Sequence, residues 1–208
     1  MDKDKNVIYV GDPMCSWCYG FANTIRGLRD LFGARVRFRL VMGGLRPDGT
    51  HIADDQYTGF LRGHWAEVGQ RTGQPFRFDI LKRTGWVYDT EKACRAVVAM
   101  RRIDPQAEWD YFAAAQKGFY HDNHDPNDPR SYARLAHALG VSESDFLAAY
   151  QGEDAIGETQ QDFAWARQIG VSSFPTVVLQ DAKGLRALTV GYRPLEILQP
   201  LMAQWLDG

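Results

Sequence analysis

Two cysteines separated by two residues, Cys15 and Cys18, constrain the fold of this chain more than any other feature. They directly follow a short apolar run at residues 7–10 and precede a segment with helical periodicity. Unpaired backbone N–H groups at the start of a helix stabilise a thiolate, so a CxxC pair placed there can exchange a disulfide with another molecule. The pair therefore predicts a fold in which the first turn of a helix follows a buried strand.

The residues around the pair predict a strand–helix–strand unit. One face of the predicted helix is apolar: Phe21, Ile25, Leu28 and Phe32. We expect this helix to end at Gly33. Residues 36–40 then alternate between apolar side chains and arginines, which indicates a strand with one face in water. A strand, a helix and a second strand in this order are expected to close as a right-handed parallel unit.

A long helical segment separates this unit from the remaining strands. Residues 54–170 show only helical periods, which predict a helical insertion domain. Strand patterns return at residues 176–179 and 187–190, and Gly184 supplies positive φ in the turn between them. A closing helix is predicted over residues 195–205. The fold class is therefore α/β, a thioredoxin fold (βαβ…ββα) formed by residues 1–53 and 171–208, with a large all-helical insertion.

The position of each cysteine predicts its chemical role. Cys15 is expected at the open end of the helix, where the N–H groups converge, and Cys18 about one turn further in, where it is more buried. We therefore assign Cys15 as the attacking thiolate and Cys18 as the resolving thiol, which attacks the mixed disulfide and releases the substrate. Asp12 either opposes the thiolate charge or serves as a turn residue before Pro13.

Other interpretations of the cysteines and histidines compete with this one. A structural zinc site needs two further ligands, and the sequence has no second CxxC and no HxxxH to supply them. Cys94 lies in a predicted apolar helix, where a buried free thiol competes with a redox sensor. Residues 121–125 (HDNHD) are better explained as a loop before the next helix than as a metal cluster. We predict no metal.

Composition limits the partners and the compartment. The chain has 24 basic and 26 acidic residues and a formal charge of −2, which favours neither a nucleic-acid partner nor a basic membrane surface. The charged N-terminus is followed by an apolar run too short for a signal peptide or a membrane span. We therefore expect a cytoplasmic protein, in which a CxxC pair is more often catalytic than a permanent structural disulfide.

Four segments of the sequence resemble a known family. They are residues 12–20 (DPMCSWCYG), 42–45 (MGGL), 170–176 (GVSSFPT) and 191–194 (GYRP). Together they resemble the DsbA-like thioredoxin family, and most closely its FrnE-like cytoplasmic branch of predicted protein-disulfide isomerases. The resemblance covers nearly the whole chain, insertion included. The chain departs from the founding pattern in having Ser-Trp between the cysteines, where that pattern has a histidine, and in lacking a signal peptide.

The resemblance implies roles for several further residues. Pro175 would be a cis-proline packed against the active-site pair, and the backbone of Phe174 would bind an extended peptide or thiol substrate. The insertion would cap the active site and shape a substrate groove. Gly43 and Gly44 would lie near that groove and let a ligand approach the backbone, although a plain turn explains them as well. Trp17 is a candidate substrate contact or a simple packing residue.

The predicted function is that of a thiol–disulfide oxidoreductase or protein-disulfide isomerase acting on protein, peptide or low-molecular-weight thiols and disulfides. No tightly bound cofactor is expected, and glutathione is a candidate co-substrate. The alternative is a glutathione-dependent isomerase or transferase of the same fold, whose members usually carry serine at the position of Cys15. A non-catalytic binding module is a third class, and the aromatic-rich insertion is a candidate homodimer surface.

Overall fold

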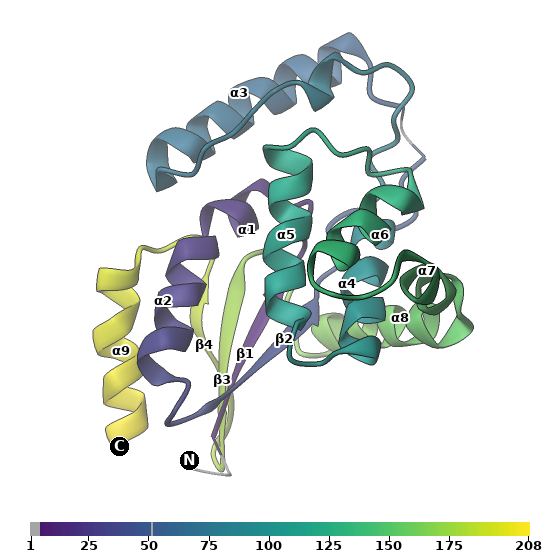
Figure 1. The fold of residues 1–208 in the computed structure, drawn as a ribbon. Helices are drawn as coiled ribbons and strands as arrows, with labels where there is room; N and C mark the ends of the chain where they lie inside the picture. The colour runs from purple at the N-terminus through teal and green to yellow at the C-terminus, as the bar shows by residue number, and fades with distance from the viewer. Residues whose placement is uncertain (1–4, 51) are drawn as a thin grey trace.

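A four-stranded sheet forms the centre of the molecule, and its strand order is β2-β1-β3-β4 (Figure 1). The structure is a computed structural model that describes residues 5–50 and 52–208. The strands are β1 (Asn6–Gly11), β2 (Arg37–Met42), β3 (Thr176–Asp181) and β4 (Gly184–Val190). β1 pairs parallel with β2 and antiparallel with β3, and β3 pairs antiparallel with β4. The predicted thioredoxin order is confirmed.

Alternate side chains of β1 face two different layers. Val7 and Tyr9 pack into the main core together with the helices α1 (Ser16–Gly20), α2 (Ala22–Phe32) and α9 (Leu195–Asp207). Ile8 and Val10 pack on the opposite face, against α8 (Glu153–Gln168). In Figure 1, α2 and α9 lie side by side and α8 lies across the sheet from them. Both faces of the central strand are therefore covered, which explains its continuous apolar run.

The predicted first helix is divided in two. α1 ends at Gly20, and α2 begins at Ala22 and ends before Gly33, as predicted. The backbone N–H of Phe21 donates to the carbonyl groups of Trp17 and Cys18, which closes α1. The CxxC pair therefore lies on a short separate helix rather than on the longer one.

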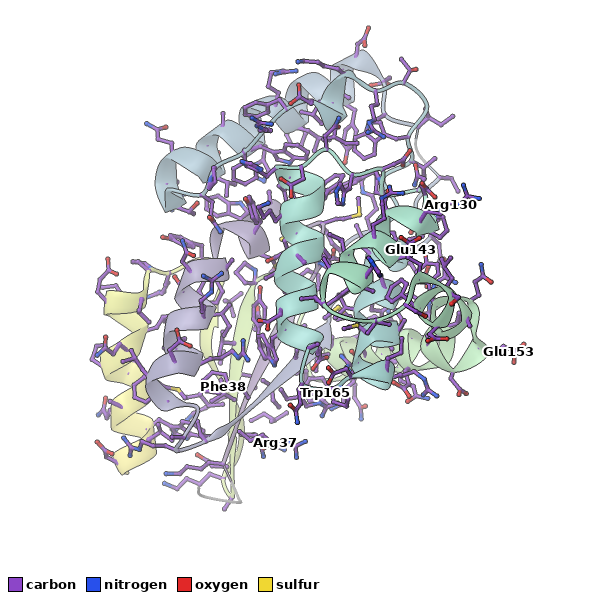
Figure 2. All side chains as sticks on the ribbon, in the orientation of Figure 1. Arg37, Phe38, Arg130, Glu143, Glu153 and Trp165 are labelled. Carbon is purple, nitrogen blue, oxygen red and sulfur yellow. The ribbon has the colours of Figure 1, made fainter. Side chains whose placement is uncertain are left out.

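The insertion between β2 and β3 is helical, as predicted. It comprises α3 (Asp55–Thr72), a short 3-10 helix η1 (Ile80–Lys82), α4 (Glu91–Ile103), α5 (Glu108–Tyr120), α6 (Pro129–Ala138), α7 (Glu143–Gln151) and α8. α4 contacts α5, α6, α7 and α8, and its residues from Ala96 to Met100 are fully buried. Charged residues such as Arg130, Glu143 and Glu153 project from the outer surface (Figure 2).

Several predicted helix boundaries have a visible physical cause. The side chains of Asp54, Asp128 and Ser142 accept backbone N–H bonds at the starts of α3, α6 and α7. Gly140 follows α6 with φ of 89°. Residues 121–125 form a loop before α6, and within the described ranges no group of three or more His, Cys, Asp or Glu side chains is arranged to hold a metal ion.

The alternation predicted for residues 36–40 is confirmed, and β2 continues for two residues beyond it. Arg37 and Arg39 are exposed, but the last three residues of the strand, Leu40, Val41 and Met42, are all buried. The cause is α8, which covers the second face at this end of the strand, and Trp165 of α8 lies 5.2 Å from the guanidinium of Arg39. A strand whose water-facing side is covered by a distant helix cannot be recognised from its own alternation.

An ion-pair network joins the insertion to the sheet. The Arg101 guanidinium of α4 donates to Asp162 at 2.9 Å, to Glu108 at 2.5 Å and to the Leu40 carbonyl oxygen of β2 at 3.2 Å. Asp162 also accepts the backbone N–H of Met42. The apolar core runs without a break from the sheet into the insertion, and the division of the chain at residues 54 and 170 stays a prediction. Within the described ranges, no helix is both long and apolar enough to span a membrane.

Candidate active site

Cys15 lies where β1 ends and α1 begins. It is the N-cap residue of α1, with extended backbone dihedrals of −89° and 116°. Its backbone N–H donates to the carbonyl of Asp12, and its own carbonyl accepts the N–H of Tyr19. Cys15 is 4% exposed and lines a groove, whereas Cys18 is fully buried behind it. Both are free thiols, and their order of burial is the one predicted for an attacking and a resolving cysteine.

The loop before β3 brings a second chain segment against Cys15. Val10 pairs with Thr176, so the end of β1 lies beside the start of β3. The Cys15 sulfur donates to the carbonyl oxygen of Phe174 at 3.6 Å. The Phe174–Pro175 peptide bond is cis, as the family resemblance implies, and Pro175 is buried. The carbonyl of Pro175 accepts the backbone N–H of Gly191 at 2.7 Å, which fixes this loop to the end of β4.

Asp12 is a structural crosslink as well as a turn residue. Its carboxylate is fully buried and accepts the backbone N–H of Met14 at 2.8 Å and of Leu45 at 2.7 Å. The thiol of Cys94 also donates to it at 3.4 Å. Burial raises the pKa of Asp12, and the N–H groups of Leu45 and Met14 oppose that rise. Asp12 therefore ties the active-site turn to the loop after β2 and to α4.

Two tyrosines from the insertion hold the peptide just before Cys15. The hydroxyls of Tyr88 and Tyr120 both donate to the carbonyl oxygen of Met14 at 2.5 Å. Tyr88 precedes α4 and Tyr120 ends α5, and both hydroxyls are buried. Burial raises the pKa of both tyrosines, so they remain protonated donors. The insertion thus positions the active-site turn directly.

The groove beside Cys15 has a volume of about 390 Å³ and lies between α3 and the segments that hold Cys15, Leu45 and Phe174. Its other lining residues are Ser16, Trp17, Leu45, Arg46, Tyr57, Phe60, Leu61, His64, Trp65, Tyr88, Ser172, Ser173 and Phe174. Among these described residues, Arg46 alone carries a permanent charge, and its guanidinium lies 5.2 Å from the ring of Tyr57 and 5.5 Å from that of Tyr88. The groove suits a ligand with an apolar body and one anionic group.

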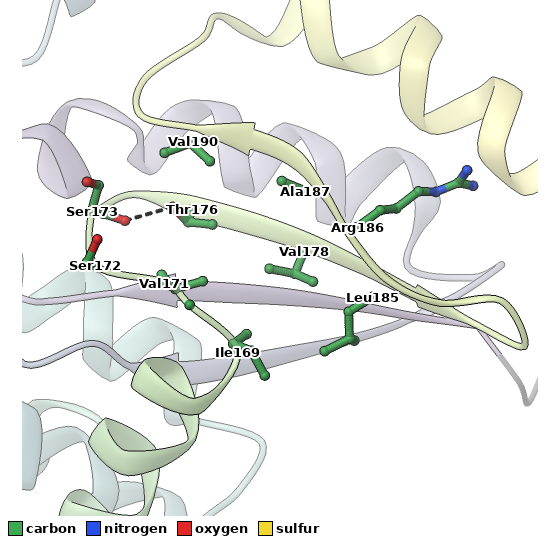
Figure 3. Close-up of a pocket in the computed structure, with 11 residues that line it drawn as sticks. Ile169, Val171, Ser172, Ser173, Thr176, Val178, Leu185, Arg186, Ala187 and Val190 are labelled. Carbon is green, nitrogen blue, oxygen red and sulfur yellow. Dashed lines mark hydrogen bonds between the residues drawn. The ribbon is translucent and has the colours of Figure 1, made fainter.

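A second cavity lies on the other side of the loop that precedes β3 (Figure 3). Ser172 and Ser173 line both this cavity and the groove, but Cys15 lines only the groove. Within the loop, the Thr176 hydroxyl donates to the Ser173 carbonyl at 2.7 Å. The remaining wall comes from residues 169–171, directly after α8, and from β3 and β4, including Leu185. This cavity is therefore separate from the thiol chemistry.

The predicted substrate contacts have different surroundings. Trp17 is half-buried and lines the groove, and its ring lies 5.0 Å from the Arg71 guanidinium and 6.0 Å from the ring of Tyr192. Trp17 therefore packs against neighbouring side chains and also faces the groove. Phe174 also lines the groove. These positions bring Cys15, Trp17 and Phe174 together.

Gly43 and Gly44 owe their small size to neighbouring rings. A Cβ atom at Gly43 would lie 2.3 Å from the ring of Phe174, and one at Gly44 would lie 2.9 Å from the ring of Phe163. Gly44 also has φ of 67°, which favours glycine. In the structure, aromatic side chains fill the space that we expected a ligand to use. A contact of either glycine with substrate stays a prediction.

The pKa values of the two fully buried thiols, Cys18 and Cys94, are raised. Burial raises the pKa of Cys18 well above its usual value, and the adjacent Cys15 raises it further. The backbone of Asp12 and the side chain of Tyr9 act in the opposite direction. Burial and the nearby Asp12 carboxylate raise the pKa of Cys94. Cys94 is buried and hydrogen-bonded to Asp12, as expected of a packing cysteine.

A comparison of the sequence with a protein-family model assigns the chain to a family. The model of the DSBA-like thioredoxin domain matches residues 6–203. The chain belongs to the DsbA-like thioredoxin family. This DsbA-like protein is 35% identical to a proposed protein disulfide isomerase from Nitrosomonas europaea, with a TM-score of 0.91 over 99% of this chain and 98% of the other. No curated protein matches the chain. The match to a FrnE-like branch stays a prediction.

More distant structures share the fold of this DsbA-like protein. The cytosolic disulfide reductase DsbM from Pseudomonas aeruginosa is 23% identical, with a TM-score of 0.81 over 97% of this chain and 98% of the other. A structure of a 2-hydroxychromene-2-carboxylate isomerase is 14% identical, with a TM-score of 0.68 over 96% of this chain and 95% of the other. These likenesses concern the fold alone.

Sequence reasoning missed three elements of the site. Tyr88, Tyr120 and Arg46 lie far from the CxxC pair along the chain and in no motif that refers to it. Their positions depend on how the insertion and the loop after β2 pack around the active-site turn, for which local periodicity carries no signal. The only available hint was the arginine directly after the MGGL segment, a charged side chain beside two glycines.

Proposed function

We propose that this DsbA-like protein is a thiol–disulfide oxidoreductase in which Cys15 is the nucleophile and Cys18 the resolving thiol. One observation carries the proposal. The Cys15 sulfur faces a substrate-sized groove at the start of α1, and the buried Cys18 lies one helical turn behind it. Two-step exchange requires a thiolate at an open position and a second thiol placed to attack the mixed disulfide that the first one forms.

The reaction proceeds in two exchanges. The Cys15 thiolate attacks one sulfur of a substrate disulfide, and the other sulfur leaves as a thiolate that takes up a proton. The Cys18 thiolate then attacks the Cys15 sulfur, forming the Cys15–Cys18 disulfide and releasing the second substrate thiol. Two electrons have passed from the protein to the substrate, and a thiol donor returns them. The reverse sequence oxidises a dithiol substrate.

The groove supports two substrate classes, peptide disulfides and glutathione-type disulfides. We propose that an extended peptide binds alongside the backbone of Phe174, next to Cys15. Aromatic walls and the single guanidinium of Arg46 suit a small thiol that carries a carboxylate. The Pseudomonas aeruginosa protein was solved with GSH, which supports glutathione as the electron donor here. That protein is also called cytosolic, which supports a cytoplasmic role.

A direct test uses single substitutions in the full chain. Cys15→Ser should abolish reduction of insulin by glutathione or another thiol donor, because the attacking sulfur is lost. Cys18→Ser should accumulate a mixed disulfide on Cys15 and lose turnover. Cys94→Ser is the matched control, because serine keeps a donor for Asp12, and it should retain activity. Unchanged turnover in Cys15→Ser would overturn the proposal.

The alternative, a glutathione-dependent isomerase or transferase, makes a different prediction. Such an enzyme needs bound glutathione but no internal disulfide, so Cys18→Ser would keep full activity. This alternative is considered because the 2-hydroxychromene-2-carboxylate isomerase shares the fold. The presence of both cysteines, with Cys18 directly behind Cys15, favours redox exchange.

A further inference from the structure

The hydroxyl of Tyr9 is buried at the centre of the fold without a well-formed hydrogen bond. Tyr9 lies in the middle of β1, paired with Leu40 on one side and Val177 on the other. Its side chain is fully buried, and its ring lies 5.8–6.0 Å from the rings of Phe21, Trp109 and Phe112. Within the described ranges its oxygen has no properly aligned partner. A buried hydroxyl in this condition costs free energy, so its retention requires a reason.

The absence of a side chain at Gly11 directs the Tyr9 hydroxyl toward the active-site turn. Tyr9 and Gly11 lie on the same face of β1, two residues apart. A Cβ atom at Gly11 would lie 2.7 Å from the ring carbon that bears the hydroxyl and 2.8 Å from the hydroxyl oxygen itself. The hydroxyl group therefore lies against the backbone of Gly11, immediately before Asp12.

The Cys18 sulfur faces the same place. The Asp12 backbone and the Tyr9 side chain are neighbours of this sulfur, and both lower the pKa of Cys18. The charged or titratable groups that act on Tyr9 are Cys18, Cys15 and Asp12, and each raises its pKa. Burial raises that pKa most, so Tyr9 remains a protonated donor throughout the range in which thiols ionise.

We propose that the Tyr9 hydroxyl is a catalytic group for the resolving step, in which it donates a hydrogen bond to the Cys18 sulfur as that sulfur becomes a thiolate. This inference rests on the proposed function. In the step, Cys18 loses its proton, its sulfur attacks the Cys15 sulfur of the mixed disulfide, and the Cys15–substrate bond breaks. The departing substrate sulfur takes both bonding electrons and a proton. Tyr9 keeps its own proton and only stabilises the attacking anion.

The requirement for such a donor follows from the burial of Cys18. Removing the thiol from water disfavours its ionised form, and the helix start that serves Cys15 is a turn away. A hydrogen bond from a neutral donor to an anion in a buried site is stronger than one in water. The Tyr9 hydroxyl therefore has only a weak acceptor in the resting Cys18 thiol, and a strong one in the Cys18 thiolate of the reacting state.

The test separates the two exchanges with a chromogenic disulfide, 5,5′-dithiobis(2-nitrobenzoate). Cys15 attacks this reagent and releases one 5-thio-2-nitrobenzoate, and Cys18 then releases the second by closing the internal disulfide. We expect Tyr9→Phe to slow the second release about tenfold or more, as loss of a hydrogen bond to a charged group predicts, and to leave the first unchanged. The pH midpoint of the second release should move upward.

Two further variants guard against a general loss of structure. Tyr111→Phe removes another buried hydroxyl, which donates to the Tyr132 carbonyl at 3.0 Å, and should leave both releases unchanged. Gly11→Ala keeps the Tyr9 hydroxyl but displaces it, and should slow the second release. An unaltered second release in Tyr9→Phe, with the wild-type pH midpoint, would overturn the inference. Absence of any second release in the wild-type protein would instead overturn the proposed function.

Discussion

The Cys15 sulfur and the carbonyl oxygen of Phe174 lie 3.6 Å apart, although 159 positions separate the two residues along the chain. The antiparallel pairing of β1 with β3 causes this proximity, since it places the end of one strand beside the start of the other. The backbone beside the nucleophile is therefore supplied by the chain segment that follows the whole insertion. We therefore expect a substrate that reaches the Cys15 sulfur to contact that segment as well.

Gly43 couples this contact to the loop after β2. A Cβ atom there would lie 2.3 Å from the Phe174 ring, so Gly43→Ala should push Phe174 and its carbonyl away from Cys15. We expect a loss of about 1–3 kcal/mol in the free energy of unfolding and a lower rate of disulfide exchange. Gly157→Ala in α8 is the matched control, since nothing lies within 4 Å of its added carbon. Urea denaturation and insulin reduction measure the two effects, and equal results for the two variants would contradict the prediction.

The tyrosine pair on the Met14 carbonyl should behave non-additively. Tyr88→Phe or Tyr120→Phe alone leaves one hydroxyl on that carbonyl and should cost about 1 kcal/mol in the free energy of unfolding. The double variant leaves a buried carbonyl without either donor and should cost more than the sum. A double-mutant cycle by urea denaturation measures the difference, and simple additivity would show that the two hydroxyls act independently.

Asp12 predicts a pH-dependent stability. Because burial raises its pKa in the folded state, the unfolded chain ionises at lower pH than the native protein. The stabilising contribution of this group is complete below its unfolded pKa, near 3.9 for aspartate, and is lost as pH rises through the higher folded value. Wild-type protein should therefore lose stability relative to Asp12→Asn over that window. Urea denaturation at several pH values measures the difference, which would stay constant if Asp12 ionised normally.

Arg46 predicts how the groove selects its substrate. Arg46→Ala should raise the KM for glutathione disulfide about tenfold, roughly 1.4 kcal/mol, and change kcat little, because the lost contact is made equally in the ground and transition states. Arg62→Ala removes another arginine from the adjacent α3, one that lies over Phe78 outside the groove, and should leave KM unchanged. Equal KM values for both variants would place the carboxylate elsewhere.

The sequence predicted the elements of this fold and much less of the contacts between them. The CxxC pair, the helical face from Phe21 to Phe32 and the glycine at 184 each act through local backbone geometry, and each lies where it was predicted. The burial of Val41 at the end of β2 was not predicted, because α8, more than a hundred residues away, covers that face. Long-range packing leaves no period in the strand that it covers.

In the candidate site too, local features could be predicted from the sequence and long-range contacts could not. Cys15 and Cys18 could be located from a short motif, and the cis peptide before Pro175 from the family resemblance. The fixation of Met14 by Tyr88 and Tyr120 could not, because it depends on the exact register of the insertion against α1. Gly43 and Gly44 were predicted to let a ligand approach the backbone, whereas in the structure the rings of Phe174 and Phe163 occupy the space beside them.

We propose above all that Cys15 and Cys18 form one reversible redox pair. A titration of the full chain against mixtures of reduced and oxidised glutathione, followed by alkylation and mass measurement, tests it most directly. Both thiols should become protected together in a single two-electron transition, peptide mapping should find a Cys15–Cys18 disulfide, and Cys94 should stay outside it. A stable glutathione adduct on Cys15 with Cys18 still free, at every ratio, would contradict the claim.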